Sequence, residues 1–361
     1  MADERDVTEK SGNLGRREFL GAAAATAAAA TLVTPELAHA ADPPPPPPGL
    51  AAAPPTGFVP WTAPGKVVKV SKPGSLMPNQ IYPKADDAKV MLEKVMTELT
   101  GKGTLVDAVK LFFHPQDKVV VKLNGIALAN MSTNKELVLP FLDAMIAAGI
   151  PAGNITVLEQ YPSFLMGTRV SAANVPHGVN VNVHNNTDAT MAARIITGTG
   201  VQTKFVRALT ESTAVVNFAL IKDHSICGYT GTLKNMTHGC TINPHDFHLH
   251  HASPQIALLA AQDVIKSRVR LTITDAFKVM CHGGPLDKAP QYRLPYEAVF
   301  ASTDMVAMDT IGWEIVEDFR KKKNLRSLTD EGRPPSYIKA AGDLGLGIAD
   351  RSKISLREVA I

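Results

Sequence analysis

The stretch Val119-Val120-Val121-Lys122-Leu123-Asn124 indicates the fold, because three consecutive valines make a strand apolar on both faces. Such strands occupy the centre of a parallel sheet that is covered by helices on both sides. Other short apolar runs alternate with helical patterns, as in crossover units; they span residues 67–70, 155–158, 179–183, 214–220, 269–274 and 298–301. The sequence therefore predicts an α/β fold with a mostly parallel central sheet and helices on both faces.

The composition of the 361 residues, 45% hydrophobic and 20% charged, is that of a folded globular protein. Lys and Arg number 37 against 34 Asp and Glu, so the net charge is only +3. A domain-wide basic field of the kind that binds nucleic acid is therefore absent from the sequence. Three cysteines are too few for a disulfide scaffold. We expect one large domain and no nucleic-acid partner.

The N-terminus has the order of features found in an export signal. Arg16-Arg17 precedes Phe19-Leu20, an Ala-rich apolar run follows at 21–33, and Ala38-His39-Ala40 supplies a small-x-small cleavage pattern. The apolar run is shorter than the roughly 20 residues of a membrane span. The paired arginines resemble a twin-arginine signal, which export machinery reads. We predict a twin-arginine signal at residues 1–40, a periplasmic or other extracytoplasmic location, and no transmembrane span in the mature chain.

The rest of the chain divides by composition. Six consecutive prolines at 43–48 and Pro54-Pro55 favour extended polyproline II, so residues 41–65 are predicted to form a stiff tether. Residues 66–345 contain the alternating strand and helix patterns and form the predicted α/β domain. Residues 346–361 are predicted to be a C-terminal tail.

Three predicted central strands end in a charged residue: Lys122, Lys222 and Asp275. Ligands of open parallel sheets bind beyond the carboxyl ends of the strands, so these ends are expected to converge. Asn124 and His224 follow the two lysines closely. Two lysines directed into one crevice would form an anion site. The alternative is that each lysine is a solvent-exposed strand end.

A glycine-containing loop follows the second of these strands. Residues 228–232 include Thr230 and Gly231, whose backbone N–H groups could bind a carboxylate or phosphate, and Lys234-Asn235 come directly after them. We therefore place these four residues in the predicted anion site.

Histidines are concentrated next to this region. Neutral imidazole and thiolate are the usual ligands of zinc, copper or iron, and one short window offers His238, Cys240, His245, His248, His250 and His251. This set is a candidate site for a transition metal ion. The alternative is a loop whose histidines bond to the backbone. Cys227 and Cys240 could instead form a disulfide in an oxidising compartment.

Several common site motifs are missing from the sequence. No Gly-x-Gly-x-x-Gly follows a strand, no nucleotide P-loop occurs, and there is no Gly-x-Ser-x-Gly elbow. We therefore predict neither NAD nor a P-loop nucleotide as cofactor, and the cofactor remains unknown apart from the metal ion considered above.

An ordered set of segments resembles the domain of unknown function 362 family. The segments are 119–124, 216–224, 229–235, 271–276 with Gly284-Pro285, and 301–309. The resemblance implies an α/β fold and extends the candidate site to Gly284, Asp304 and Asp309. Some relatives carry ferredoxin-like cysteine clusters, but three scattered cysteines cannot ligate a four-cysteine iron–sulfur cluster unaided.

Three functions are compatible with these patterns. The first is an exported enzyme for a small anionic substrate: Lys122, Lys222 and Lys234 hold the charge, Asn124 and Asn235 orient the substrate, and His224 with Asp275 act as acid and base, with Lys222 an alternative base. The second is a metal or redox-cofactor protein that uses the histidine window. The third is a non-catalytic solute-binding protein.

Overall fold

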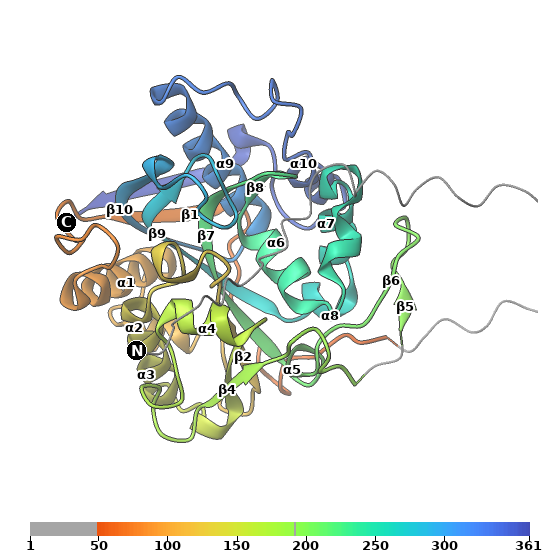
Figure 1. The fold of residues 1–361 in the computed structure, drawn as a ribbon. Helices are drawn as coiled ribbons and strands as arrows, with labels where there is room; N and C mark the ends of the chain where they lie inside the picture. The colour runs from red at the N-terminus through yellow and green to blue at the C-terminus, as the bar shows by residue number, and fades with distance from the viewer. Residues whose placement is uncertain (1–48, 191–192) are drawn as a thin grey trace, which may run out of the picture. The chain divides into compact units, whose positions relative to one another are not determined.

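The computed structural model describes residues 49–190 and 193–361 (Figure 1). The predicted signal at 1–40 and the first part of the predicted tether, 41–48, lie outside these residues. In the part of the chain described, no helix is long and apolar enough to cross a membrane.

The fold is built on a mixed nine-stranded sheet. From one edge to the other its strands are β11 (Ser355–Ala360), β1 (Lys66–Ser71), β10 (Arg293–Ser302), β9 (Val269–Met280), β7 (Ala214–His224), β2 (Val119–Lys122), β3 (Ile155–Glu159) and β4 (Asn180–Val183), while β8 (Gly228–Thr230) pairs with β7. The five strands from β9 to β4 are parallel, and β10 is antiparallel to both of its neighbours. The predicted α/β fold with a mostly parallel sheet is confirmed. A separate two-stranded sheet joins β5 (Arg194–Ile195) and β6 (Gln202–Thr203).

The valines that indicated the fold occupy the middle of this sheet. Val119 pairs with Ala214 of β7 and Ile155 of β3, so β2 is enclosed by strands on both sides. Val119 and Val121 pack into one apolar cluster, whereas Val120 packs into another. This alternation puts apolar side chains on both faces of the strand, as a central parallel strand requires.

Helices cover both faces of the sheet (Figure 1). The first face is covered by α1 (Ala85–Thr100), α2 (Leu105–Val109) and α3 (Lys135–Ala147). The second is covered mainly by α6 (Thr232–Thr237), α7 (Gln255–Ala260), α8 (Asp263–Lys266), α9 (Met305–Lys322) and α10 (Tyr337–Asp343). Shorter elements complete the domain: α4 (Pro162–Thr168), α5 (Arg207–Thr210), and the 3-10 helices η1 (Leu128–Asn130), η2 (Ala152–Asn154), η3 (His238–Cys240), η4 (Pro244–Ala252), η5 (Pro290–Tyr292) and η6 (Arg351–Lys353).

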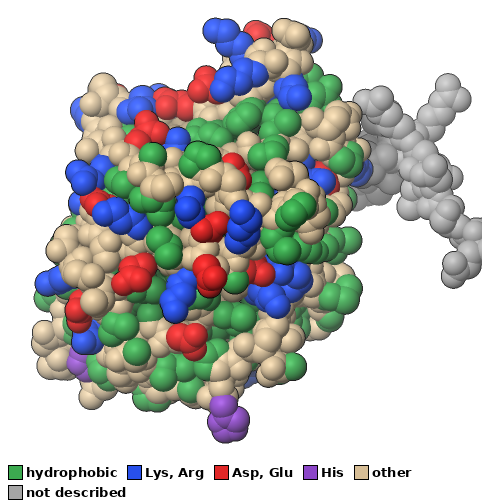
Figure 2. Space-filling view, turned by 90° about the vertical axis from the view of Figure 1, so that its left-hand side faces the viewer, with side chains coloured by type: hydrophobic (Ala, Val, Ile, Leu, Met, Phe, Trp, Pro, Cys, Tyr) green, Lys and Arg blue, Asp and Glu red, His purple; other side chains and the backbone are tan. Residues whose placement is uncertain are grey.

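Both ends of the described chain pack against the domain. Residues 346–361, for which the sequence predicts a tail, contain β11, which pairs in parallel with β1. Within the segment predicted as a tether, Leu50 N donates to Asp263 Oδ2 at 2.6 Å and Trp61 N donates to Leu111 O at 2.9 Å. On the face shown in Figure 2, basic and acidic side chains are interspersed. That face carries no large patch of a single sign of charge.

Candidate functional site

A cavity of about 360 Å³ lies where β2, β3 and β7 end. Its buried polar lining consists of Lys122, Asn124, Glu159, Thr230, Lys234 and Asn235. Four imidazoles also line it, those of His224, His238, His245 and His248. Apolar side chains form other parts of the wall, among them Ile126, Phe164, Ile226 and Leu286. The cavity therefore combines a polar, nitrogen-rich lining with an apolar surface.

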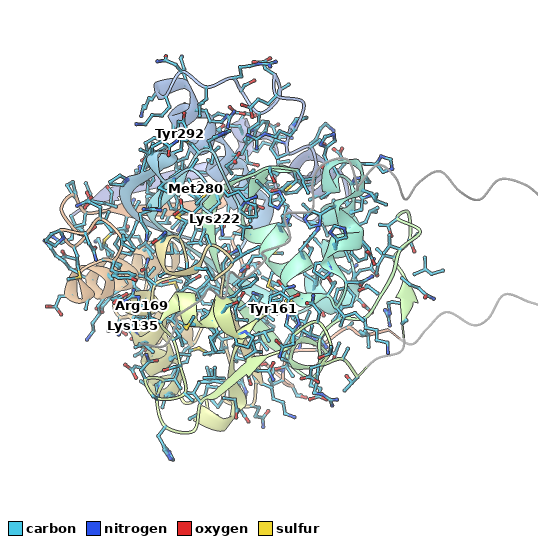
Figure 3. All side chains as sticks on the ribbon, viewed as in Figure 1. Lys135, Tyr161, Arg169, Lys222, Met280 and Tyr292 are labelled. Carbon is cyan, nitrogen blue, oxygen red and sulfur yellow. The ribbon has the colours of Figure 1, made fainter. Side chains whose placement is uncertain are left out.

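Strand ends account for much of this convergence. Lys122 is the last residue of β2, Glu159 the last of β3 and His224 the last of β7. Because these strands are parallel, their carboxyl ends meet at one edge of the sheet. Figure 3 labels Lys222 on β7 and Tyr161, which follows β3 and also lines the cavity.

Lys122 is neutralised within the protein. Its Nζ donates to Glu159 Oε2 at 2.6 Å and to Leu123 O at 2.5 Å. Both side chains are buried, with exposed fractions of 1% and 3%. Removing one partner of such a buried pair would leave an uncompensated charge. Lys122 and Glu159 thus contribute a fixed dipole to the cavity and almost no net charge.

Lys222 lies behind the cavity lining and orients two asparagines that are part of it. Its Nζ donates to Asn124 Oδ1 at 2.7 Å, and Asn124 Nδ2 donates to Asn235 Oδ1 at 3.2 Å. Asn235 Nδ2 then donates to Asn217 Oδ1 at 2.7 Å and to Phe218 O at 3.1 Å. The chain of bonds fixes which end of each amide is oxygen. Burial lowers the pKa of Lys222 to about 7.

Lys234 projects from α6 into the cavity and contacts two histidines. Its Nζ lies 3.1 Å from His224 Nε2 and 3.2 Å from His248 Nε2. Burial lowers the pKa of Lys234, since desolvation disfavours the ammonium. Burial also lowers the pKa of His224 far below its ordinary value and that of His248 to about 4. Both imidazoles are therefore neutral near pH 7.

Helix α6 is held in place by a carboxylate from α9. Asp309 Oδ1 accepts from Thr232 N at 2.6 Å, and Oδ2 accepts from Leu233 N at 3.0 Å. These are N-terminal amides of α6, which would otherwise lack acceptors. A Cβ at Gly231 would lie 2.2 Å from Asp309 Oδ1, so this position requires glycine. Asp309 and Gly231 thus position the helix that carries Lys234.

One comparison with known proteins covers the region that contains this site. Residues 119–314 match the family model described as Domain of unknown function (DUF362). The chain belongs to the DUF362 family. The DUF362 match runs from β2 into α9 and includes all the residues that line the cavity.

Other comparisons add little to the DUF362 match. The lactate racemase apoprotein from Thermoanaerobacterium thermosaccharolyticum is similar in structure at a TM-score of 0.39 and 11% sequence identity, over 70% of this chain and 57% of that chain. The aligned region therefore spans less than two thirds of that protein. Among curated proteins, none matches this sequence.

None of the three predicted site aspartates lines the cavity: Asp309 holds α6, and the other two lie elsewhere. Asp275 falls within β9, which continues to Met280, so its carboxylate is not at a strand end. It is buried and accepts from Asn134 N at 2.8 Å and Asn134 Nδ2 at 2.9 Å, at the start of α3. Asp304 caps α9, accepting from Val306 N and Ala307 N. Neither lines the cavity, so the structure does not bring Asp275 to His224.

Gly284, also predicted to bind substrate, is next to the cavity. Its neighbours Pro285 and Leu286 line the wall. A Cβ at Gly284 would lie 1.9 Å from Asp223 O, so this close approach requires glycine.

The predicted metal ligands are only partly assembled. His238 and His248 have ring centroids 4.7 Å apart, and those of His245 and His248 are 6.3 Å apart. His250 and His251 are exposed outside the lining, and Cys240 is buried in an apolar cluster. Among residues 49–190 and 193–361, no group of three or more His, Cys, Asp or Glu side chains is arranged to hold a metal ion. Cys227 and Cys240 are both free thiols.

Two features of the site are not predicted by the sequence patterns described above. Glu159 follows the predicted strand at 155–158, so the strand-end rule that selected Lys122 could have found it. The contacts of Lys234 with His224 and His248 join three separate elements. No local pattern in the sequence indicates that arrangement.

Proposed function

We propose that this DUF362 protein binds a small organic anion, with its charged group at the buried polar lining and its apolar part against the hydrophobic wall. One observation carries the proposal. Lys222 and Lys234 are buried, with exposed fractions of 0% and 8%, and no carboxylate in the described part of the chain forms an ion pair with either. A buried amine without a counterion is poorly stabilised as an ammonium. An anion in the cavity would supply the missing charge.

An unpartnered hydroxyl supports this proposal. Thr230 lines the cavity, and its buried Oγ1 has no hydrogen-bond partner within the described residues. Buried hydroxyls nearly always have a partner. A carboxylate oxygen in the cavity is the partner that we propose.

The wall of the cavity favours an apolar substituent on the anion. Phe164 and Ile126 contribute to this wall. Ile226 and Leu286 also line it, and their side chains are 38% and 49% exposed, so a ligand could cover them. Apolar lining with a few fixed polar groups is typical of sites for small organic molecules. Phenylacetate, 4-methylpentanoate and phenyl phosphate are therefore suitable probes, because they share an apolar body and differ in shape or anionic group.

The test is a calorimetric titration of these three probes into wild-type protein, Thr230→Val and Thr274→Val. Thr274 is a matched control, because its Oγ1 is also buried and unpartnered but belongs to β9 outside the cavity lining. We expect Thr230→Val to weaken binding of the best probe by roughly 10- to 100-fold, the effect of one hydrogen bond to a charged group. Thr274→Val should leave affinity unchanged. Equal affinities for the two variants, or no probe binding more tightly than about 1 mM to wild type, would contradict the proposal.

A further inference from the structure

The backbone fixes the position of the proton on His224. Its Nδ1 accepts from Ile226 N at 3.1 Å and from Cys227 N at 3.4 Å. A ring nitrogen that accepts hydrogen bonds carries no proton. In a neutral imidazole the proton is then on Nε2, the atom that lies 3.1 Å from Lys234 Nζ. His224 is therefore a donor toward Lys234.

The proton on His248 is fixed in the opposite sense. Its Nδ1 lies 3.0 Å from Pro244 O, and a carbonyl oxygen can only accept. Nδ1 therefore carries the proton, and in the neutral ring Nε2 is bare. Since Nε2 lies 3.2 Å from Lys234 Nζ, His248 accepts a hydrogen bond from Lys234.

These two assignments determine the state of Lys234. An ammonium has three donors and no acceptor. It would therefore place an N–H group against the N–H of His224, and no hydrogen bond could form between them. An uncharged amine satisfies both contacts, accepting from His224 and donating to His248. The other ionisable groups close to it are Lys222, the buried imidazole of His238 and the thiol of Cys227. Burial raises the pKa of Cys227 to about 11, so none of these groups carries a negative charge at pH 7. Burial also lowers the pKa of Lys234, and a lower pKa favours the uncharged amine.

We propose that Lys234 is an uncharged amine in the ligand-free protein and that it forms an imine with a carbonyl carbon of the bound anion. This inference rests on the proposed function, and it narrows the ligand to an oxo acid with an apolar substituent. Buried, uncharged lysine amines are the usual nucleophiles for carbonyl carbon.

The reaction needs no oxidant or further reactant. The Nζ lone pair attacks the carbonyl carbon, a C–N bond forms, and the C–O π bond opens onto the oxygen. His248 Nε2 accepts one proton from Nζ and passes it to this oxygen, which becomes a hydroxyl. His248 Nε2 then accepts the second Nζ proton and gives it to the hydroxyl as the C–O bond breaks. One water molecule leaves as the C=N bond forms. Amine and carbonyl compound thus give imine and water, with no net change in protons or electrons.

The experiment uses the full chain with benzoylformate, an oxo acid with a phenyl group, and sodium cyanoborohydride at pH 7. Reduction converts an imine into a stable secondary amine, which peptide mass spectrometry then locates. We expect the adduct on Lys234 of the wild-type protein. Lys234→Arg should remove it, whereas Lys339→Arg, at a surface ion pair with Asp343, should not.

Two variants of His224 test the proton assignment. In His224→Gln the amide nitrogen can still donate toward Nζ, whereas His224→Leu has no donor. Both variants lose the ring nitrogen Nδ1, which accepts from Ile226 N and Cys227 N. We expect the Leu variant to trap at least about tenfold more slowly than the Gln variant at pH 7 and to recover at higher pH, because its amine pKa rises by about one unit or more.

The outcomes separate this inference from the proposed function. Labelling confined to Lys234 supports the imine. Phenylacetate binding without labelling of Lys234, or labelling no greater than at Lys339, would overturn the imine and leave the proposed function intact. Failure of both binding and labelling would overturn both. Mapping the adduct on wild-type protein requires no variant to fold, and equal pH profiles for the two His224 variants would refute the proton assignment.

Discussion

Anion binding is expected to draw a proton onto Lys222. The pKa of Lys222 is lowered to about 7, first by burial and further by the charge of Lys122, while Glu159 and Asp287 oppose the shift. At pH 7 the side chain is therefore about half protonated. An anion in the cavity favours the ammonium and raises the pKa toward its ordinary value.

The number of protons taken up on binding, and the change of affinity with pH, follow from the titration of Lys222. Binding should take up about 0.5 proton at pH 7 and about 0.9 at pH 8, and affinity should fall by up to tenfold for each pH unit above 7. Affinity falls as the pH rises because the pKa of Lys222 is higher in the anion-bound protein than in the free protein. Binding is therefore strongest at pH values below the Lys222 pKa of the free protein.

The assay is calorimetric titration of phenylacetate at one pH in buffers of different ionisation enthalpy, where the slope of the observed enthalpy gives the protons taken up. Lys222→Met should abolish the uptake and weaken binding. Lys278→Met is the matched control: Lys278 is also buried, with its pKa lowered to about 8 by burial, but it donates to the carbonyls of Ile81 and Asn130 outside the cavity. Equal proton uptake in wild type and Lys222→Met would refute the reasoning.

Three further predictions concern other parts of the chain. Glu159→Gln should lower the free energy of unfolding by about 3–5 kcal/mol, because Lys122 would remain buried without its carboxylate; a loss under about 1 kcal/mol in urea denaturation would contradict this. Asp275→Asn should lower the stability by about 1–3 kcal/mol and leave phenylacetate affinity within about twofold, since the carboxylate accepts bonds at the start of α3; lost binding in a stable variant would point instead to a role in the site. Replacing Arg16 and Arg17 by Lys should keep the protein in the cytoplasm of a twin-arginine-competent bacterium, and unchanged export in cell fractionation would count against the predicted signal.

The central part of the fold was predictable because its strands are short, apolar and separated by helical patterns. Val119 to Val121 identify a strand that needs cover on both faces, and the sheet provides it. The edge strand β11 was not predictable, because it is exposed along much of its length and its apolar residues do not alternate regularly with polar ones. Its strand conformation depends on pairing with β1, far away in the sequence.

The candidate site was predictable to the extent that strands end where their apolar runs end. The rule holds for Lys122 and His224, which line the cavity. It fails for Asp275, because β9 continues through residues that are also buried. For Lys222, the side chain is directed at Asn124 and not into the cavity lining. Sequence spacing cannot distinguish these cases, since the direction of a side chain depends on its partners in three dimensions.

The most direct test of the central claim is a crystal structure of the protein grown with saturating phenylacetate. The account predicts the phenyl ring against Phe164 and Leu286, with a carboxylate oxygen within hydrogen-bond distance of Lys234 Nζ or Thr230 Oγ1. A structure in which phenylacetate occupies another surface, or in which the cavity contains only water at saturating ligand, would contradict it.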